Sequence, residues 1–154
     1  MEKCYKNILV PLDTSELAEL ALADALSVAR LCHADVTLLH VITPLDKVFA
    51  TDLGYTVYID QQWSDQKRQA LDYLENVYQR HDFGDLIVHK AVETGAPAET
   101  IIDFSGRTPI DLIVMATHGR SGLRRWVYGS VADKVLRGAY VPILLVRAHP
   151  EPAA

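Results

Sequence analysis

The sequence predicts an α/β protein of the Rossmann-like kind, a single-domain open five-stranded parallel sheet with helices on both faces. Five short runs rich in Ile, Val and Leu alternate with segments of helical spacing. Several runs are continuously apolar, which is typical of strands covered on both faces. Right-handed crossovers wind the order β-α-β-α-β-α-β-α-β into such a sheet.

The predicted strands leave room for a helix between each pair. They cover residues 8–12, 36–42, 86–92, 110–115 and 143–146. The last strand is apolar, and we expect it at a sheet edge, where unpaired backbone groups invite pairing with another chain. This favours a homodimer in which strand 142–147 lies antiparallel to its mate across a two-fold axis.

Four helices are predicted between the strands. The first two carry apolar stripes over 17–32 and 63–81. A third helix starts at Ala96-Pro97, because proline is favoured in a first turn. The fourth has Ser130 as its expected N-cap and Gly138 as its expected terminating residue.

The longest connection without a clear period covers 43–59. It contains Pro44, Gly54 and three aromatic residues, and it is long for a compact domain. We expect a flexible loop or lid there. The rest of 1–154 is expected to form one domain that ends in a C-terminal tail over 148–154.

Composition excludes several classes of protein. With 49% hydrophobic and 23% charged residues the chain has the balance of a globular domain, and its net charge of -5 gives no field for nucleic acid or an anionic membrane. Cys4 and Cys32 form no CxxC motif, so a zinc or thioredoxin-like centre has no support and reduced thiols are expected. The apolar stretch near the N-terminus is too short for a signal peptide, which favours a cytoplasmic, unanchored protein.

Ligands of open α/β sheets bind at the carboxyl ends of the strands, where the strand order reverses. Pro11, Leu12 and Asp13 lie at the end of the first strand, and a glycine-containing turn after the fourth leads to a helix start at Gly129. Free N–H groups and the helix dipole favour a phosphate at such a start. Because neither GxxxxGK[ST] nor GxGxxG occurs, another mode of nucleotide binding is needed.

This turn resembles the nucleotide-binding motif of the universal stress protein family, G-x-x-G, nine residues, G-[ST]. Here the motif is A-T-H-G, nine residues, G-S, so Ala116 stands where the first glycine is usual. The resemblance extends from NILVPLD at 7–13 to VPILLVR at 141–147. It implies an adenine nucleotide alpha-hydrolase-like fold.

The resemblance also implies a ligand, ATP or another adenine nucleotide, with Mg²⁺ or Mn²⁺ bridging its phosphates. Asp13 would contact the ribose, backbone groups of Val41 the adenine, and the glycine-containing turn the phosphates. The residues expected around the nucleotide are Pro11, Leu12, Asp13, Val41, Met115, Ala116, His118, Gly119, Arg120, Gly129, Ser130 and Val131. No catalytic residue and no protein metal ligand is assigned.

By the same resemblance the protein is a nucleotide-dependent sensor or regulatory dimer in stress survival, with slow ATP hydrolysis at most. The alternative is a family member without nucleotide that acts through protein contacts, and Ala116 is the residue that separates the two. Because Ala116 continues an extended run, its φ should be negative, where alanine costs little.

Two local alternatives also stay open. Asp13 fits an N-cap of the first helix, with Glu16 completing a capping box. Gly119 to Gly122 forms a GxxG sequence like that of RNA-binding KH modules, although the preceding strand and the acidic charge argue against nucleic acid.

Overall fold

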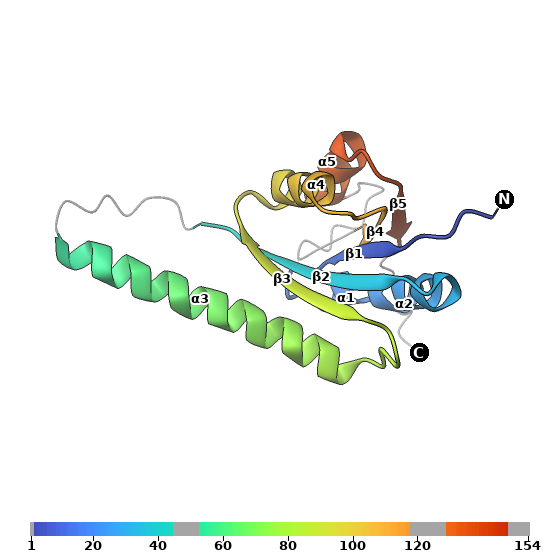
Figure 1. Ribbon diagram of the computed structural model, residues 1–154. Coiled ribbons are helices and arrows are strands. Elements are labelled where there is room, and N and C mark those ends of the chain that lie inside the picture. Colours follow the sequence, from blue (N-terminus) through green and yellow to red (C-terminus); the bar gives the residue numbers. More distant parts are fainter. Residues whose placement is uncertain (1, 45–52, 118–128, 148–154) are drawn as a thin grey trace, which may run out of the picture.

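Strands and helices alternate along the chain in the computed structural model (Figure 1). The structure describes residues 2–44, 53–117 and 129–147. No helix within these ranges is both long and apolar enough to cross a membrane. The expected C-terminal tail over 148–154 lies outside the described residues.

One five-stranded parallel sheet forms the centre of the molecule, which confirms the predicted fold class. The strand order is β3-β2-β1-β4-β5, and every neighbouring pair is parallel. The strands are β1 (Asn7–Pro11), β2 (Asp35–Ile42), β3 (Val88–Thr94), β4 (Leu112–Ala116) and β5 (Ile143–Val146). Their bounds lie within two residues of the prediction, and β5 is at an edge as expected.

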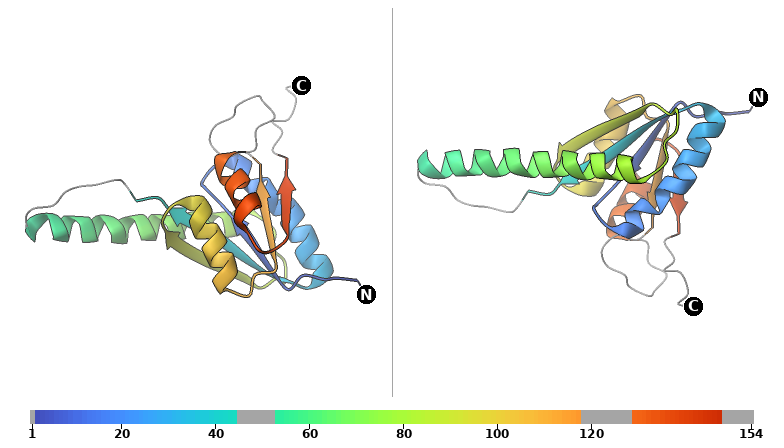
Figure 2. Two further views of the ribbon diagram at one scale, coloured as in Figure 1. Left: turned by 90° about the horizontal axis from the view of Figure 1, so that it is seen from above. Right: turned by 90° about the horizontal axis from the view of Figure 1, so that it is seen from below.

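Helices cover both faces of the sheet, as Figure 1 and Figure 2 show. The helices on one face are α1 (Glu16–Glu19), α2 (Ala21–Cys32) and α3 (Leu53–Arg80), and those on the other are α4 (Pro97–Arg107) and α5 (Ser130–Gly138). Each layer buries its own apolar cluster, one around Leu22, Leu74 and Val77 and the other around Ile101 and Val135. The connections therefore change face between β1 and β4, which makes this pair the switch point of the sheet.

The helix α3 begins at Leu53 and extends beyond the end of the sheet (Figure 1). The prediction of a loop over 43–59 is therefore wrong for residues 53–59, while 45–52 lie outside the described residues. Gly54 and the lack of helical spacing hid this part of the helix in the sequence. Once the packed part of α3 has formed, each further residue adds a backbone hydrogen bond at low cost.

The first predicted helix is divided in two at Leu20. This residue ends α1 and precedes α2, and its N–H donates to the Leu17 carbonyl three residues back rather than four. An apolar stripe does not distinguish a continuous helix from one interrupted by a tight turn.

The ends of α5 differ from the prediction by one residue each. Gly129 is the N-cap, and Ser130 is the first helical residue. Gly138 is the last helical residue, and the described glycines with positive φ are Gly84 and Gly95 instead. A Cβ at Gly138 would lie 2.6 Å from Cδ1 of Ile102, so close packing of α5 on α4 accounts for this glycine better than a left-handed turn does.

We expect Gly95→Ala to destabilise the fold by about 1–3 kcal/mol. Gly95 has a φ of +152°, and an added Cβ would lie 2.5 Å from Oγ1 of Thr100. The matched control is Gly106→Ala in α4, where a Cβ meets nothing within 4 Å and the helix should gain about 0.5–1 kcal/mol. Urea unfolding of both variants measures the difference, and equal stabilities would contradict the assigned backbone strain.

Candidate functional site

A cavity of about 690 Å³ lies at the carboxyl ends of β1, β2 and β4. This volume is in the usual range of small-molecule sites. Residues from both helical layers complete its wall, because it sits where the connections change face. The lining residues are Pro11, Leu12, Asp13, Thr14, Ala18, Leu39, His40, Val41, Ile42, Thr43, Gln66, Gln69, Ala70, Tyr73, Pro97, Ile101, Met115, Ala116, Thr117, Gly129, Ser130, Val131 and Ala132.

The structure brings most of the predicted site residues together around this cavity. Those that line it are Pro11, Leu12, Asp13, Val41, Met115, Ala116, Gly129, Ser130 and Val131. His118, Gly119 and Arg120 lie outside the described residues. The contacts that each of these residues makes with a ligand stay predictions.

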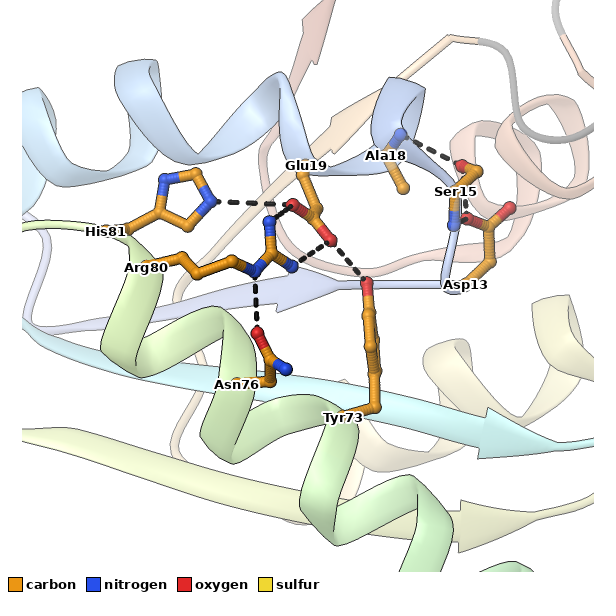
Figure 3. A network of polar contacts seen from close by, with 8 residues as sticks. All are labelled: Asp13, Ser15, Ala18, Glu19, Tyr73, Asn76, Arg80 and His81. Atoms are coloured by element: carbon orange, nitrogen blue, oxygen red, sulfur yellow. Dashed lines mark hydrogen bonds and ion pairs between the residues drawn. The ribbon is translucent and has the colours of Figure 1, made fainter.

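A tight turn follows β1 and carries Asp13 at the edge of the cavity. Oδ1 of Asp13 accepts hydrogen bonds from both the backbone N–H and the hydroxyl of Ser15. Ser15 in turn caps α1, since its Oγ accepts from the N–H of Ala18 at 3.1 Å (Figure 3). The alternative that Asp13 caps the helix is therefore wrong. The turn orients the exposed carboxylate of Asp13, and Thr14, between Asp13 and Ser15, has a positive φ of 71°.

The backbone of β2 is exposed to the cavity beyond the end of β1. Pairing between these strands ends at Leu39, whose carbonyl accepts from the N–H of Leu12 at 2.8 Å. Alternate residues of a strand direct their backbone groups to the same side, so Val41 directs its N–H and C=O toward the side that β1 has left. A polar strand edge thus borders the cavity beside Val41, one of its lining residues.

Two helices begin at the cavity without a side-chain cap. Gly129 precedes α5 and Ala96 precedes α4, and neither provides a capping side chain. The N–H of Gly129 donates to the carbonyl of Thr117 at 2.6 Å, which fixes the start of α5 beside the end of β4. The first N–H groups of a helix have no partner within it and carry partial positive charge. This end of the cavity is therefore suited to an anion.

The helix α3 forms a wall that the sequence-based prediction missed. Gln66, Gln69 and Tyr73 line the cavity from it. Tyr73 also packs edge-on against His40, with 5.7 Å between ring centroids, and Nδ1 of His40 is 2.8 Å from the Leu12 carbonyl oxygen. The sequence did contain a signal for this wall. Gln66, Gln69 and Tyr73 are spaced by three and four residues, so they share one face of the helix with the buried Ala70.

A polar network holds this part of α3 against α1 (Figure 3). The carboxylate of Glu19 accepts from the Tyr73 hydroxyl at 3.2 Å and from two nitrogens of Arg80 at 3.0 and 3.1 Å, and Nε2 of His81 lies 3.5 Å away. Burial acts to raise the pKa of Glu19, but hydrogen bonds from Arg80, His81 and Tyr73 outweigh it and lower that pKa. Burial and the Glu19 charge raise the pKa of Tyr73, so its hydroxyl stays a donor.

The described residues contain no group of three or more His, Cys, Asp or Glu side chains that could hold a metal ion. Mg²⁺ is commonly bound through substrate phosphates and few carboxylates, a mode that needs no such group.

A parallel sheet that helices cover on both faces, with a cavity at its switch point, defines a doubly wound α/β protein of the Rossmann-like class. The chain belongs to the universal stress protein family, whose model matches residues 4–147. This confirms the resemblance seen in the sequence.

Individual relatives agree with this assignment. The chain is 30% identical to Universal stress protein MJ0531 of Methanocaldococcus jannaschii, over 95% of this chain and 84% of that protein. Its fold is similar to that of MJ0577 from the same organism, with a TM-score of 0.81, 27% identity and coverage of 97% and 100%. A universal stress protein family protein from Arabidopsis thaliana, solved with AMP bound, has a TM-score of 0.64, 19% identity and coverage of 95% and 94%.

Replacing Glu19 by Gln should lower the free energy of unfolding at pH 7 by about 1–2 kcal/mol, since Arg80 is half exposed and part of the ion pair is screened. The native pKa of Glu19 lies below its unfolded value of about 4.3. Its contribution is therefore present above that pH and is lost as the pH falls through the native pKa. Urea unfolding of wild type and variant should converge in acid.

The matched control is Glu16→Gln, at an exposed acidic residue of the same helix. It should change the stability by less than about 0.5 kcal/mol. A gap between wild type and Glu19→Gln that stays constant down to pH 2 would contradict the charged role of Glu19.

Proposed function

We propose that this chain binds an adenine nucleotide, ATP by preference, in the cavity at the carboxyl ends of β1, β2 and β4. In this proposal it acts as a cytoplasmic, nucleotide-dependent sensor or regulatory dimer in stress survival. The observation that carries the proposal is the convergence on one cavity of an oriented carboxylate, a strand edge that β1 no longer pairs, and two helix starts whose N-cap residues provide no capping side chain. Each has a counterpart in the nucleotide.

The edge of β2 suits the adenine base. Adenine presents a ring-nitrogen acceptor and an amino donor side by side, and the N–H and C=O of Val41 offer the complementary pair. Guanine carries an oxygen acceptor where adenine has the amino donor, so it would place two acceptors against each other. Met115, 6% exposed and on the cavity wall, supplies apolar contact for the ring.

The turn after β1 and the start of α5 suit the sugar and the phosphates. Asp13 has a carboxylate to accept from ribose hydroxyls, and its orientation is held by Ser15. The N–H groups of Ser130 and Val131 and the hydroxyl of Ser130 suit phosphate oxygens. In the proposal His118, Gly119 and Arg120 complete this part of the site, and Mg²⁺ or Mn²⁺ enters with the phosphates.

The backbone at Ala116 supports nucleotide binding over a purely protein-contact role. The described non-glycine residues with positive φ are Thr14 and His33, so Ala116 has the negative φ expected of it. A glycine is not required there for its conformation. The methyl group of Ala116 takes only a little room from the cavity wall.

Gly129→Asp should abolish ATP binding in calorimetry with Mg²⁺ or Mn²⁺, where the wild type binds one nucleotide per chain. The carboxylate would occupy the N–H groups at the start of α5 and repel phosphate. Aspartate is a favoured N-cap and Gly129 has a φ of -51°, so the fold should be kept. Gly129→Asn, an equally good cap without charge, should lose much less affinity.

Ala116→Gly is the control for space in the same cavity. It should change ATP affinity by less than about tenfold, or ~1.4 kcal/mol. Unchanged affinity in Gly129→Asp would show that the phosphates lie elsewhere. No wild-type binding at millimolar ATP, or a hundredfold gain in Ala116→Gly, would favour the protein-contact alternative.

We further propose that the chain is a homodimer through strand 142–147. The strand β5 is at an edge and Leu144 is 38% exposed. Light scattering at tens of micromolar should give the mass of a dimer, and Leu144→Lys should shift it to a monomer. The matched control is Leu31→Lys at an exposed leucine of α2, which should leave a dimer. A monomeric wild type would contradict this interface.

A further inference from the structure

The two cysteines meet at the end of the sheet opposite the cavity. Cys4 lies in the segment that precedes β1, and Cys32 is the last residue of α2, just before β2 begins. Their Sγ atoms are 2.6 Å apart, and both are free thiols. We propose that Cys4 and Cys32 form a redox modification site, at which a small-molecule disulfide converts the two thiols reversibly into an intramolecular disulfide.

The backbone on both sides keeps the two sulfur atoms together. The N–H groups of Lys6 and Asn7 donate to the two carboxylate oxygens of Asp111 at 2.9 and 3.0 Å, and the N–H of Asp35 donates to the Lys6 carbonyl at 2.9 Å. The end of α2 is fixed by the Ala34 N–H, which donates to the Ala29 carbonyl at 2.9 Å. Asp35 and Asp111 thus hold the segment that follows Cys4, and the end of α2 holds Cys32.

The remaining gap is small. A disulfide has an S–S length of about 2.05 Å, so bond formation requires the sulfur atoms to approach by roughly 0.5 Å. Cys4 is exposed and can be reached by a dissolved oxidant, while Cys32 is partly buried beside it. This arrangement fits an attacking thiol and a resolving thiol.

The two cysteines form an oxidisable pair of protonated thiols rather than a standing thiolate. The hydrogen bond with Cys32 raises the pKa of the Cys4 thiol. At neutral pH Cys4 is therefore mostly protonated, and a strongly reactive catalytic cysteine is not expected. Slow exchange with a low-molecular-weight disulfide is the chemistry that remains.

The proposed reaction is balanced by two exchange steps with oxidised glutathione. Cys4 loses its proton to solvent, and its thiolate attacks one sulfur of the glutathione disulfide, which forms a mixed disulfide and releases one glutathione thiolate. Cys32 then loses its proton and attacks the Cys4 sulfur, which releases the second glutathione thiolate. The protein pair is oxidised by two electrons, and the glutathione disulfide is reduced by two.

The cross-link would close a loop between positions 28 residues apart and so restrict the unfolded chain. It would tie the start of the sheet to α2. Because the cavity is at the other end of the strands, nucleotide binding should not depend on this bond. The inference therefore stands apart from the proposed function.

The test is to treat the full chain with oxidised glutathione, denature it, alkylate the remaining thiols and measure its mass. The oxidised wild type should take up no alkyl group, carry no glutathione and lose the mass of two hydrogen atoms. Its melting temperature should rise by about 5–10 °C and return after treatment with dithiothreitol.

Cys4→Ser and Cys32→Ser are the matched controls. Each should keep one glutathione per chain and show no such rise in melting temperature, because no second thiol is present to resolve the mixed disulfide. Two alkylated thiols in treated wild type, two bound glutathiones per chain, or disulfides only between chains would each overturn the proposal.

Discussion

The reversal of the chain connections between β1 and β4 is the constraint on which the rest of the structure depends. Both strands are buried on both faces, so helices must cover each side. The connections from β1 and β2 cover one face with α1, α2 and α3, and those from β3 and β4 cover the other with α4 and α5 (Figure 2). The chain leaves β1 toward α1 on one face while α5 lies on the other, and a cavity remains at the carboxyl ends of the strands between them.

Most polar groups at this cavity are backbone groups, and the topology of the chain places them there. The pairing of β2 with β1 ends at Leu39, whereas its pairing with β3 continues to Ile42. The edge of β2 that faces away from β3 is therefore left without β1 at Val41. Every helix after a parallel strand begins at the carboxyl end of the sheet, so the uncapped starts of α4 and α5 point to the same space. Side chains such as Asp13 and Ser130 add to a site whose main features come from topology.

The wall contributed by α3 depends on a different kind of interaction. Glu19 receives hydrogen bonds from Tyr73 and Arg80, and this network positions the cavity-lining face of α3 beside α1. A carboxylate that is largely shielded from solvent needs such donors to remain charged. Stability of the helical layer and shape of the cavity are thus linked through one residue.

The sequence alone determined the fold class, the family resemblance and the strand bounds to within two residues, because continuous apolar runs and short spacings leave few alternatives for a parallel sheet. The strand ends and the family resemblance together also identified nine cavity-lining residues, from Pro11 to Val131. Local pattern did not separate two neighbouring cap candidates, since Ser15 rather than Asp13 caps α1. At Gly138 a tertiary contact decides, because Ile102 packs against this glycine.

Tertiary structure alone decided which distant residues meet. Nothing in the spacing of Tyr73 and Glu19 shows that they share a hydrogen bond, since 54 residues separate them. The same holds for Cys4 and Cys32, which the sequence presents as two unrelated thiols and the fold places in contact. Periodicity reports how one element faces its surroundings, whereas the contact between two elements depends on the packing of the whole sheet and its layers.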